Sequence, residues 1–397
     1  MAEAYFVVMR GLDPRIPFKK TGMAGTSPAM TRRGGMRGTM TNGVNSKRVL
    51  LVAPHRPLGF AEILAKRDDV RLDVIEQETP DQAAAPVLAA AHAYQTSSTR
   101  DELARHLHAS AVFLDKTPNL LIVSTNGAGY DTVDVKTCTA RGILVVNQAG
   151  GNAEAVAEHV LGMLLMLVKR VGENDRALRA GRFTRRLDFM GREAFGKTIG
   201  IVGLGHVGRR VAELCGALFR MQVIAYDPYL DAEEMRRRGA HKVELDYLLG
   251  LADFVSINCP LTDETRRMIG AREFALMQPH AYFITTARGF IHDEEALEQA
   301  LRDKKIAGAG LDVWDREPPP AHHPLLKYDN VIASAHMAGV TREARVNMGK
   351  IAAEQLVDAL DGRKVDRIVN PEVWPHYAER FERAFGFAPA GEGIAAR

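Results

Sequence analysis

Cysteine is scarce in this sequence. Its 397 residues include three cysteines, Cys138, Cys215 and Cys259, which lie far apart and form no C-x-x-C pair. An odd number of isolated cysteines fits neither a disulfide framework nor a structural zinc site, and it is typical of a protein from a reducing compartment. We therefore predict packing roles for the three thiols, no metal site, and a cytoplasmic location.

Long uncharged hydrophobic segments are missing as well. A membrane-spanning helix needs about 20 consecutive apolar residues, whereas the longest candidate, residues 155–170, contains Glu158 and His159. The hydrophobic content of 46% and the charged content of 25% are typical of a globular protein. We therefore expect no membrane partner, and the length indicates two domains, because one domain usually has about 100 to 200 residues.

A concentration of positive charge on the folded part of the chain is also absent. The net charge is +3, but residues 1–46 alone contain seven Arg or Lys against two acidic residues, a net +5 that leaves −2 for the rest. Proteins that bind nucleic acids usually carry a basic surface on their folded domain. We therefore expect no nucleic-acid partner.

Residues 1–46 show no sustained period and are rich in Gly, Thr, Pro and Arg. They contain too little apolar surface to offset the entropy cost of ordering. We interpret them as a disordered or spurious N-terminal extension; in the second case translation would start at Met36 or Met40. An organellar transit peptide is the alternative that the Arg-rich, acid-poor composition suggests, but the segment has no long amphipathic pattern.

Short apolar runs alternate with helical patterns from residue 47 onward, which predicts parallel sheets covered by helices. The alternation stops at a long helix over residues 152–170 and then begins again, so we predict two doubly wound α/β halves. This helix should be buried between domains or subunits because it is apolar around much of its circumference. An amphipathic helix over 342–362 should follow. The expected strands are 48–53, 70–76, 120–125 and 143–147, and then 198–203, 222–227, 254–258, 281–285, 306–312 and 331–335.

A glycine pattern at the start of the second half predicts a dinucleotide site. Gly203, Gly205 and Gly208 form G-x-G-x-x-G between a strand and a helix, and Asp227 ends the next strand, nineteen residues after Gly208. The first glycine allows a tight turn, the second lets the backbone approach a pyrophosphate, and the third lets the helix pack close to the strand.

Neighbouring residues complete this predicted site. The backbone amides of His206 and Val207 should face the pyrophosphate, where the N-terminus of the helix favours an anion. Asp227 should accept hydrogen bonds from the adenosine ribose and would repel a 2′-phosphate, which favours NAD over NADP. Asp227 could instead cap a turn before Pro228.

Three polar residues, Arg288, Glu317 and His336, each lie just past an expected strand of the second half. Ligands of open parallel sheets bind at the carboxyl ends of strands, so these side chains should converge. An arginine binds a carboxylate and polarises the adjacent carbonyl, a histidine gives the carbonyl oxygen a proton, and a carboxylate orients the imidazole and favours its protonated form. The trio therefore suits hydride exchange between a nicotinamide and a 2-oxo acid, without a metal.

Each member of the trio has a less specific explanation. Arginine, glutamate and histidine taken singly are common at surfaces and in turns, so the prediction rests on their joint placement behind a cofactor loop. Two further histidines, His322 and His323, lie in the loop before the last strand. We interpret them as surface or lid residues.

Several motifs resemble those of the D-isomer-specific 2-hydroxyacid dehydrogenases, including phosphoglycerate dehydrogenases and hydroxypyruvate reductases. The resemblance covers about 120–370, while residues 48–119 agree only in general pattern. The motifs are NGAGYDTVDV (126–135), GNAEAVAEHVLGMLL (151–165), VGLGHVG (202–208), PLTDETRRMIG (260–270), TARG (286–289), GLDVWDREP (310–318) and SAHMAG (334–339).

The resemblance implies a Rossmann-like NAD domain inserted into a flavodoxin-like substrate domain. The expected boundaries are 150–337 for the NAD domain and 47–149 with 338–372 for the substrate domain, and a C-terminal tail should cover 373–397. It also implies a homodimer joined through the NAD domain and a small 2-oxo or 2-hydroxy acid as the substrate.

Roles of single residues follow from the same resemblance. Arg288 would bind the substrate carboxylate, Glu317 would partner the histidine, and His336 would be the acid and base. The substrate carboxylate would also contact the backbone around Asn126, Gly127 and Ala128. Contacts to NAD are implied for Pro260, Thr265, Thr286, Asp312 and Gly339, with Asp312 at the carboxamide.

Two departures from the family pattern affect the choice of substrate. Thr285 replaces a common Asn, and Asn126 stands where phosphoglycerate enzymes usually carry a basic residue, which favours a glyoxylate-like or hydroxypyruvate-like substrate. A short 3-phosphoglycerate dehydrogenase without a regulatory domain is the first alternative. An NAD(H)-sensing protein related to corepressors is the second. Glu317 argues against formate dehydrogenases, which pair their histidine with a glutamine.

Overall fold

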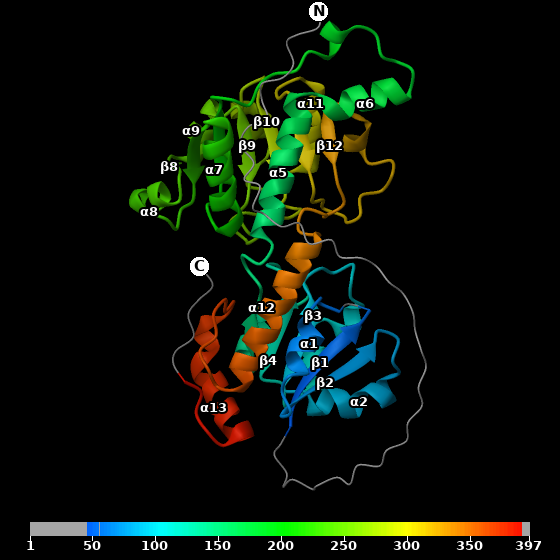
Figure 1. The fold of residues 1–397 in the computed structure, drawn as a ribbon, viewed down its shortest axis with the longest axis vertical. Coiled ribbons are helices and arrows are strands. Elements are labelled where there is room, and N and C mark those ends of the chain that lie inside the picture. Colours follow the sequence, from blue (N-terminus) through cyan, green and yellow to red (C-terminus); the bar gives the residue numbers. More distant parts are fainter. Residues whose placement is uncertain (1–45, 55, 391–397) are drawn as a thin grey trace, which may run out of the picture. The chain divides into compact units, whose positions relative to one another are not determined.

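The computed structural model describes residues 46–54 and 56–390. The expected N-terminal extension therefore lies outside the described residues, apart from its last residue. Within the described ranges the chain forms two parallel-sheet α/β domains, and the ribbon in Figure 1 shows helices on the faces of each sheet. The predicted fold class is confirmed.

The first sheet has five parallel strands in the order β2-β1-β3-β4-β5. This 2-1-3-4-5 order is the flavodoxin-like one. The strands are β1 (Lys47–Ala53), β2 (Val70–Glu76), β3 (Ala93–Ser97), β4 (Ile122–Asn126) and β5 (Leu144–Val146). The helices nearby in the chain are α1 (Phe60–Leu64), α2 (Asp81–Ala90), α3 (Ala111–Asp115) and α4 (Val135–Ala140).

The C-terminal part of the chain returns to this first sheet. Helix α12 (Arg342–Leu360) packs against α1 and β4, and its residues Ala352 and Leu356 share a core with Ile122. Helix α13 (Trp374–Phe385) lies within the expected tail 373–397, but its Tyr377 and Phe381 are buried in the same core. The first part of this tail is therefore a packed helix, while residues 391–397 lie outside the described ranges.

The second sheet has seven parallel strands in the order β12-β11-β10-β9-β6-β7-β8. The order changes direction between β6 and β9, and such a switch point is where α/β sheets bind ligands. The strands are β6 (Thr198–Val202), β7 (Gln222–Tyr226), β8 (His241–Lys242), β9 (Phe254–Ile257), β10 (Tyr282–Thr285), β11 (Gly308–Leu311) and β12 (Val331–Ala333). The helices are α5 (Ala153–Val168), α6 (Val171–Arg179), α7 (His206–Phe219), α8 (Ala232–Arg237), α9 (Leu245–Leu251), α10 (Ala271–Leu276) and α11 (Glu294–Arg302).

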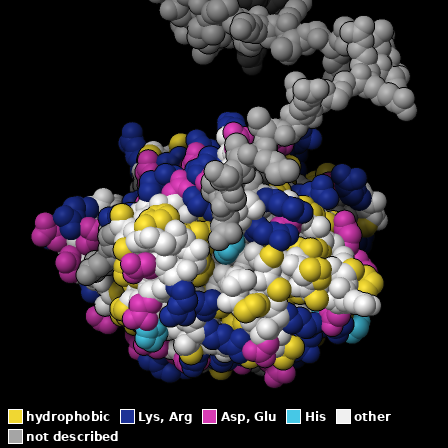
Figure 2. Space-filling model, turned by 90° about the horizontal axis from the view of Figure 1, so that it is seen from below, with side chains coloured by type: hydrophobic (Ala, Val, Ile, Leu, Met, Phe, Trp, Pro, Cys, Tyr) yellow, Lys and Arg dark blue, Asp and Glu magenta, His cyan; other side chains and the backbone are white. Residues whose placement is uncertain are grey.

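The surface carries charges of both signs. On the face drawn in Figure 2, Lys and Arg side chains are interspersed with Asp, Glu and apolar side chains. No helix of the described ranges is long and apolar enough to cross a membrane.

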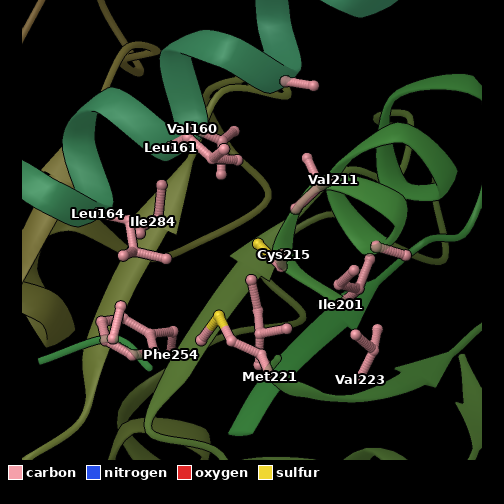
Figure 3. Close-up of a cluster of buried hydrophobic side chains, with 14 of the residues drawn as sticks. Val160, Leu161, Leu164, Ile201, Val211, Cys215, Met221, Val223, Phe254 and Ile284 are labelled. Atoms are coloured by element: carbon pink, nitrogen blue, oxygen red, sulfur yellow. The ribbon is translucent and has the colours of Figure 1, made fainter. Parts of the chain in front are cut away.

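The apolar side chains of helix α5 pack in the core that covers the second sheet. Val160, Leu161 and Leu164 pack in one cluster with Ile284 of β10, as Figure 3 shows. Fully apolar helices occur where several elements cover them, and α5 also contacts α7, β11 and β12. Most of its burial therefore arises within its own domain, while Ala155 near its start packs with Ala344 and Met348 of α12, as expected for a helix between domains.

Candidate active site

The loop after β12 brings His336 to Glu317. His336 Nδ1 lies 2.8 Å from Glu317 Oε2, and Glu317 Oε1 accepts the N–H of Trp314 at 3.0 Å. Both side chains are about one quarter exposed, at 25% and 22%. Glu317 thus fixes the orientation of the imidazole, whose Nε2 has no hydrogen-bond partner among the residues that the structure describes.

Asp312, at the end of β11, holds the loop that carries His336. Its buried carboxylate accepts the N–H groups of Met337 at 2.7 Å and Ala338 at 2.9 Å and the hydroxyl of Ser334 at 2.6 Å. Its carbonyl accepts the N–H of His336 at 2.7 Å. His336 has a φ of +54°, a conformation that side chains rarely adopt without such support. The predicted carboxamide contact of Asp312 stays a prediction.

Arg288 follows β10 and meets an acidic residue from the first sheet. Its Nε donates to Asp131 Oδ2 at 3.2 Å, and its NH1 donates to the carbonyl of Ala287 at 2.7 Å. Sequence reasoning overlooked Asp131, although it lies within the GYDTVD motif.

One cavity of about 330 Å3 brings most of the predicted substrate residues together. Both Arg288 and His336 line it, and so does buried Asp312. Its wall also includes Asn126, Gly127, Ala128, Thr286 and Gly339. A second cavity of about 230 Å3 shares Arg288, Ala128 and Thr286 with the first and is lined further by His206, Val207 and Pro260. The predicted substrate residues and part of the predicted cofactor residues thus line two adjoining cavities, whereas Gly203, Gly205 and Gly208 line neither.

The loop after β4 differs from the expectation in one respect. The N–H of Gly127 donates to the side-chain oxygen of Gln148 at 2.7 Å, and its carbonyl accepts the N–H of Gln148 at 2.8 Å. Gly127 therefore has no free amide for a substrate carboxylate. The N–H groups of Ala128 and Gly129, in contrast, have no hydrogen-bond partner within the described residues. No sequence pattern marked Gln148, which is fully buried.

The loop that contains Gly203, Gly205 and Gly208, here called the glycine loop, is closely packed at its first and third glycines and open at the second. A Cβ atom at Gly203, which has a φ of +89°, would lie 2.7 Å from the backbone N of Cys259, and one at Gly208 would lie 2.1 Å from the Gly203 carbonyl oxygen. At Gly205 no atom lies within 4 Å of that position. Helix α7 begins directly after Gly205 with no side-chain cap, so its first N–H groups can face a pyrophosphate.

Asp227 ends β7 beside this loop. Its carboxylate accepts the N–H of Leu204 at 3.0 Å and the N–H of Tyr229 at 3.1 Å. The capping role at a turn and the proposed ribose contact are thus compatible, because a carboxylate accepts several hydrogen bonds. Asp227 and Thr265 do not line the two cavities; Thr265 donates from its hydroxyl to the Pro260 carbonyl at 2.6 Å.

The side chain of His206 has a packing role in addition to the predicted role of its backbone amide. A Cβ at Gly150 would lie 3.0 Å from His206 Nδ1, so the ring packs on the backbone of Gly150, which lies three positions before the first residue of α5. Burial, and secondarily Arg209 and other arginines, lower the pKa of His206. The ring is therefore a packing group between the glycine loop and the segment leading into α5.

The remaining residues of interest are structural. Burial raises the pKa of Cys138, Cys215 and Cys259 to about 12, so the thiols stay protonated. His322 is exposed, whereas His323 is not a surface residue: its side chain is 15% exposed and pairs with Glu294 at 3.2 Å. Among the described residues no group of three or more His, Cys, Asp or Glu is arranged to hold a metal ion.

Comparison with known proteins identifies the family. The model of the "D-isomer specific 2-hydroxyacid dehydrogenase, NAD binding domain" matches residues 161–338. A glyoxylate reductase from Thermofilum pendens is 40% identical over 268 residues, which are 66% of this chain and 78% of that protein. The chain belongs to the D-isomer-specific 2-hydroxyacid dehydrogenase family.

A second relative and a solved structure are also similar to this chain. A D-3-phosphoglycerate dehydrogenase from Archaeoglobus fulgidus is 38% identical over 71% of this chain and 55% of its own length. The chain thus spans about half the length of this relative. The crystal structure of D-lactate dehydrogenase from Aquifex aeolicus with NAD and lactic acid has a TM-score of 0.68 and 28% identity and covers 79% of this chain and 96% of that chain. NAD is the cofactor of the matched domain, and the glycine loop described above fits it.

Proposed function

We propose that this protein is an NAD-dependent D-2-hydroxyacid dehydrogenase that interconverts a small 2-oxo acid and its 2-hydroxy acid. The observation that carries the proposal is that Arg288 and His336, whose ring Glu317 orients, line one cavity, and that an adjoining cavity is lined by His206 and Val207. NAD(H), when bound, supplies or accepts the hydride. Gly203, Gly205, Gly208 and Asp227 would hold it, together with the amides of His206 and Val207.

The proposed roles of the protein groups follow from their positions. Arg288 would bind the substrate carboxylate, and the free amides of Ala128 and Gly129 would add hydrogen bonds to it. His336 would give a proton from Nε2 to the carbonyl oxygen in reduction and take it back in oxidation. Glu317 would keep the ring oriented through Nδ1. Pro260, Thr265, Thr286, Asp312 and Gly339 remain the proposed residues along the cofactor.

Glyoxylate or hydroxypyruvate is the proposed substrate class, with 3-phosphohydroxypyruvate as the alternative. The relatives named glyoxylate reductase support the first, and those named D-3-phosphoglycerate dehydrogenase support the second. NADH oxidation with glyoxylate, hydroxypyruvate, phenylpyruvate and 3-phosphohydroxypyruvate tests the proposal. Turnover of at least one acid is expected; tight NADH binding without turnover would instead indicate the NAD(H)-sensing alternative.

A homodimer in the cytoplasm is part of the proposal. The segment from the start of α6 to residue 195, here called the arm, exposes several apolar side chains. Exposed apolar patches commonly mark interfaces. The exposed apolar side chains of the arm include Val171, Leu178, Phe183, Leu187, Met190 and Phe195. Two copies covering this arm would explain the exposure. A second copy and a small acid are the partners we propose; we propose neither a nucleic-acid nor a membrane partner.

The domain boundaries are also proposed. We propose 150–337 for the NAD domain and 47–149 with 338–372 for the substrate domain, and the packing of α12 on β4 supports the latter. Because α13 packs in the same core, this domain extends to residue 385.

A further inference from the structure

Asp131 and Ala287 fix two sides of the Arg288 guanidinium. Asp131 lies in the loop after β4 of the first sheet, and its carboxylate accepts Arg288 Nε at 3.2 Å. The carbonyl of Ala287 accepts NH1 at 2.7 Å. The side chains of Arg288 and Asp131 are 24% and 31% exposed, so the pair is only partly open to water. The third nitrogen, NH2, has no hydrogen-bond partner among the described residues.

Gly129 sets where NH2 lies. A Cβ atom at Gly129 would be 1.9 Å from Arg288 NH2 and 3.0 Å from its Cζ, so the guanidinium passes directly over this residue. A side chain on residue 129 would displace it. The unpartnered N–H groups of Ala128 and Gly129 belong to the same short loop, and both residues line the cavity with Arg288. These amides and NH2 therefore form one set of donors for an anion.

Asp131 could act on this set in two ways. Its negative charge could weaken the attraction of Arg288 for an anionic substrate. Its hydrogen bond could instead hold the guanidinium where NH2 meets the amides. Partly exposed ion pairs contribute little energy through charge alone, whereas a misplaced arginine loses charge-assisted hydrogen bonds, which are among the strong interactions in binding sites. The geometric effect should therefore dominate.

We propose that Asp131 is a positioning residue for Arg288: its hydrogen bond to Nε holds the guanidinium over Gly129. The inference rests on the proposed function, because it assumes that Arg288 binds the substrate carboxylate.

The test compares Asp131→Ala with Asp131→Asn in the full-length protein, with glyoxylate or hydroxypyruvate as the substrate, whichever is turned over. Asp131→Ala should raise KM for the acid about tenfold or more while kcat changes much less, because a charge-assisted bond depends on the lost support. Asp131→Asn should restore KM to within about threefold of wild type, since its amide oxygen still accepts Nε. A purely structural role would not give this split between KM and kcat together with rescue.

Two further variants complete the test. Asp68→Ala removes an exposed acidic side chain that is not part of the cavity lining and should leave KM unchanged. Gly129→Ala should raise KM as Asp131→Ala does, and it keeps the inference testable if Asp131→Ala fails to fold. A lower KM in both Asp131 variants, or an unchanged KM in Asp131→Ala or Gly129→Ala, would overturn the inference. An unchanged KM and kcat in Arg288→Ala would instead overturn the proposed function.

Discussion

His336 differs from the other histidines of its neighbourhood in what its ring nitrogens contact. Its Nδ1 faces Glu317 and its Nε2 has no partner among the described residues. Both ring nitrogens of His323 are engaged, one with Glu294 and one with the N–H of Leu325. Position after a strand was enough to single out His336 from the sequence. The role of His323 depends on Glu294, 29 residues away, and so could not be predicted.

His336→Ala should lower kcat for the reduction of the 2-oxo acid by about 10²- to 10⁴-fold, because the carbonyl oxygen loses its proton donor. The Kd for NADH should stay near that of the wild type, since the glycine loop is untouched. Steady-state kinetics and a fluorescence titration with NADH measure the two quantities. His322→Ala, an exposed neighbour, is the matched control. A wild-type kcat in His336→Ala would contradict the proposed role.

Asp227→Ala should relax the preference for NADH over NADPH. The carboxylate at the end of β7 repels a 2′-phosphate, and removing it should raise kcat/KM with NADPH relative to NADH by about tenfold, the effect of about 1.4 kcal/mol. The ratio of the two kcat/KM values measures this change. An unaltered ratio would show that Asp227 serves only as the turn cap for Leu204 and Tyr229.

At the scale of whole elements, strands that contain a run of apolar residues were predictable, and a strand composed mostly of polar residues was not. The expected strand 70–76 coincides with β2. Strand β3 was not expected, because Gln95, Thr96 and Ser97 are polar, although all three are buried. Helix α13 was also missed, since its burial depends on packing against the distant first sheet. A run of apolar residues thus reveals a strand, whereas the burial of polar side chains leaves no such pattern in the sequence.

Two glycines of α7 should respond in opposite ways to alanine. Gly208→Ala places a Cβ 2.1 Å from the Gly203 carbonyl oxygen, so it should destabilise the fold by about 1 to 3 kcal/mol and weaken NADH binding. Gly216→Ala meets only Val223, at 3.9 Å, and should stabilise α7 by up to about 1 kcal/mol. Thermal unfolding with and without NADH measures both effects. Equal shifts in the two variants would refute the close contact at Gly208.

At the scale of the whole molecule, the candidate site is assembled from both sheets. Strand ends of the second sheet supply Arg288 and His336, which their positions in the sequence predicted. Loops that follow strands of the first sheet supply Asp131, which accepts a hydrogen bond from Arg288, and Gln148, which occupies the amide of Gly127. Such partners depend on how two domains meet across long sequence separations, and no periodicity in either segment encodes that meeting. The candidate residues Arg288 and His336 were therefore predictable, and the partners Asp131 and Gln148 were not.

Stability of the whole molecule should fall in mild acid because of one buried histidine. His292 is 1% exposed, and neither ring nitrogen has a hydrogen-bond partner among the described residues. Burial lowers its pKa from 6.5 to about 4. Between these values the unfolded chain binds the proton and the folded chain does not, so the free energy of unfolding decreases as the pH falls below 6.5, by about 3 kcal/mol at pH 4. Urea unfolding at a series of pH values measures this slope. His292→Leu should remove this contribution, and the exposed His241→Gln should keep it; the same slope in His292→Leu as in the wild type would assign the acid sensitivity to other groups.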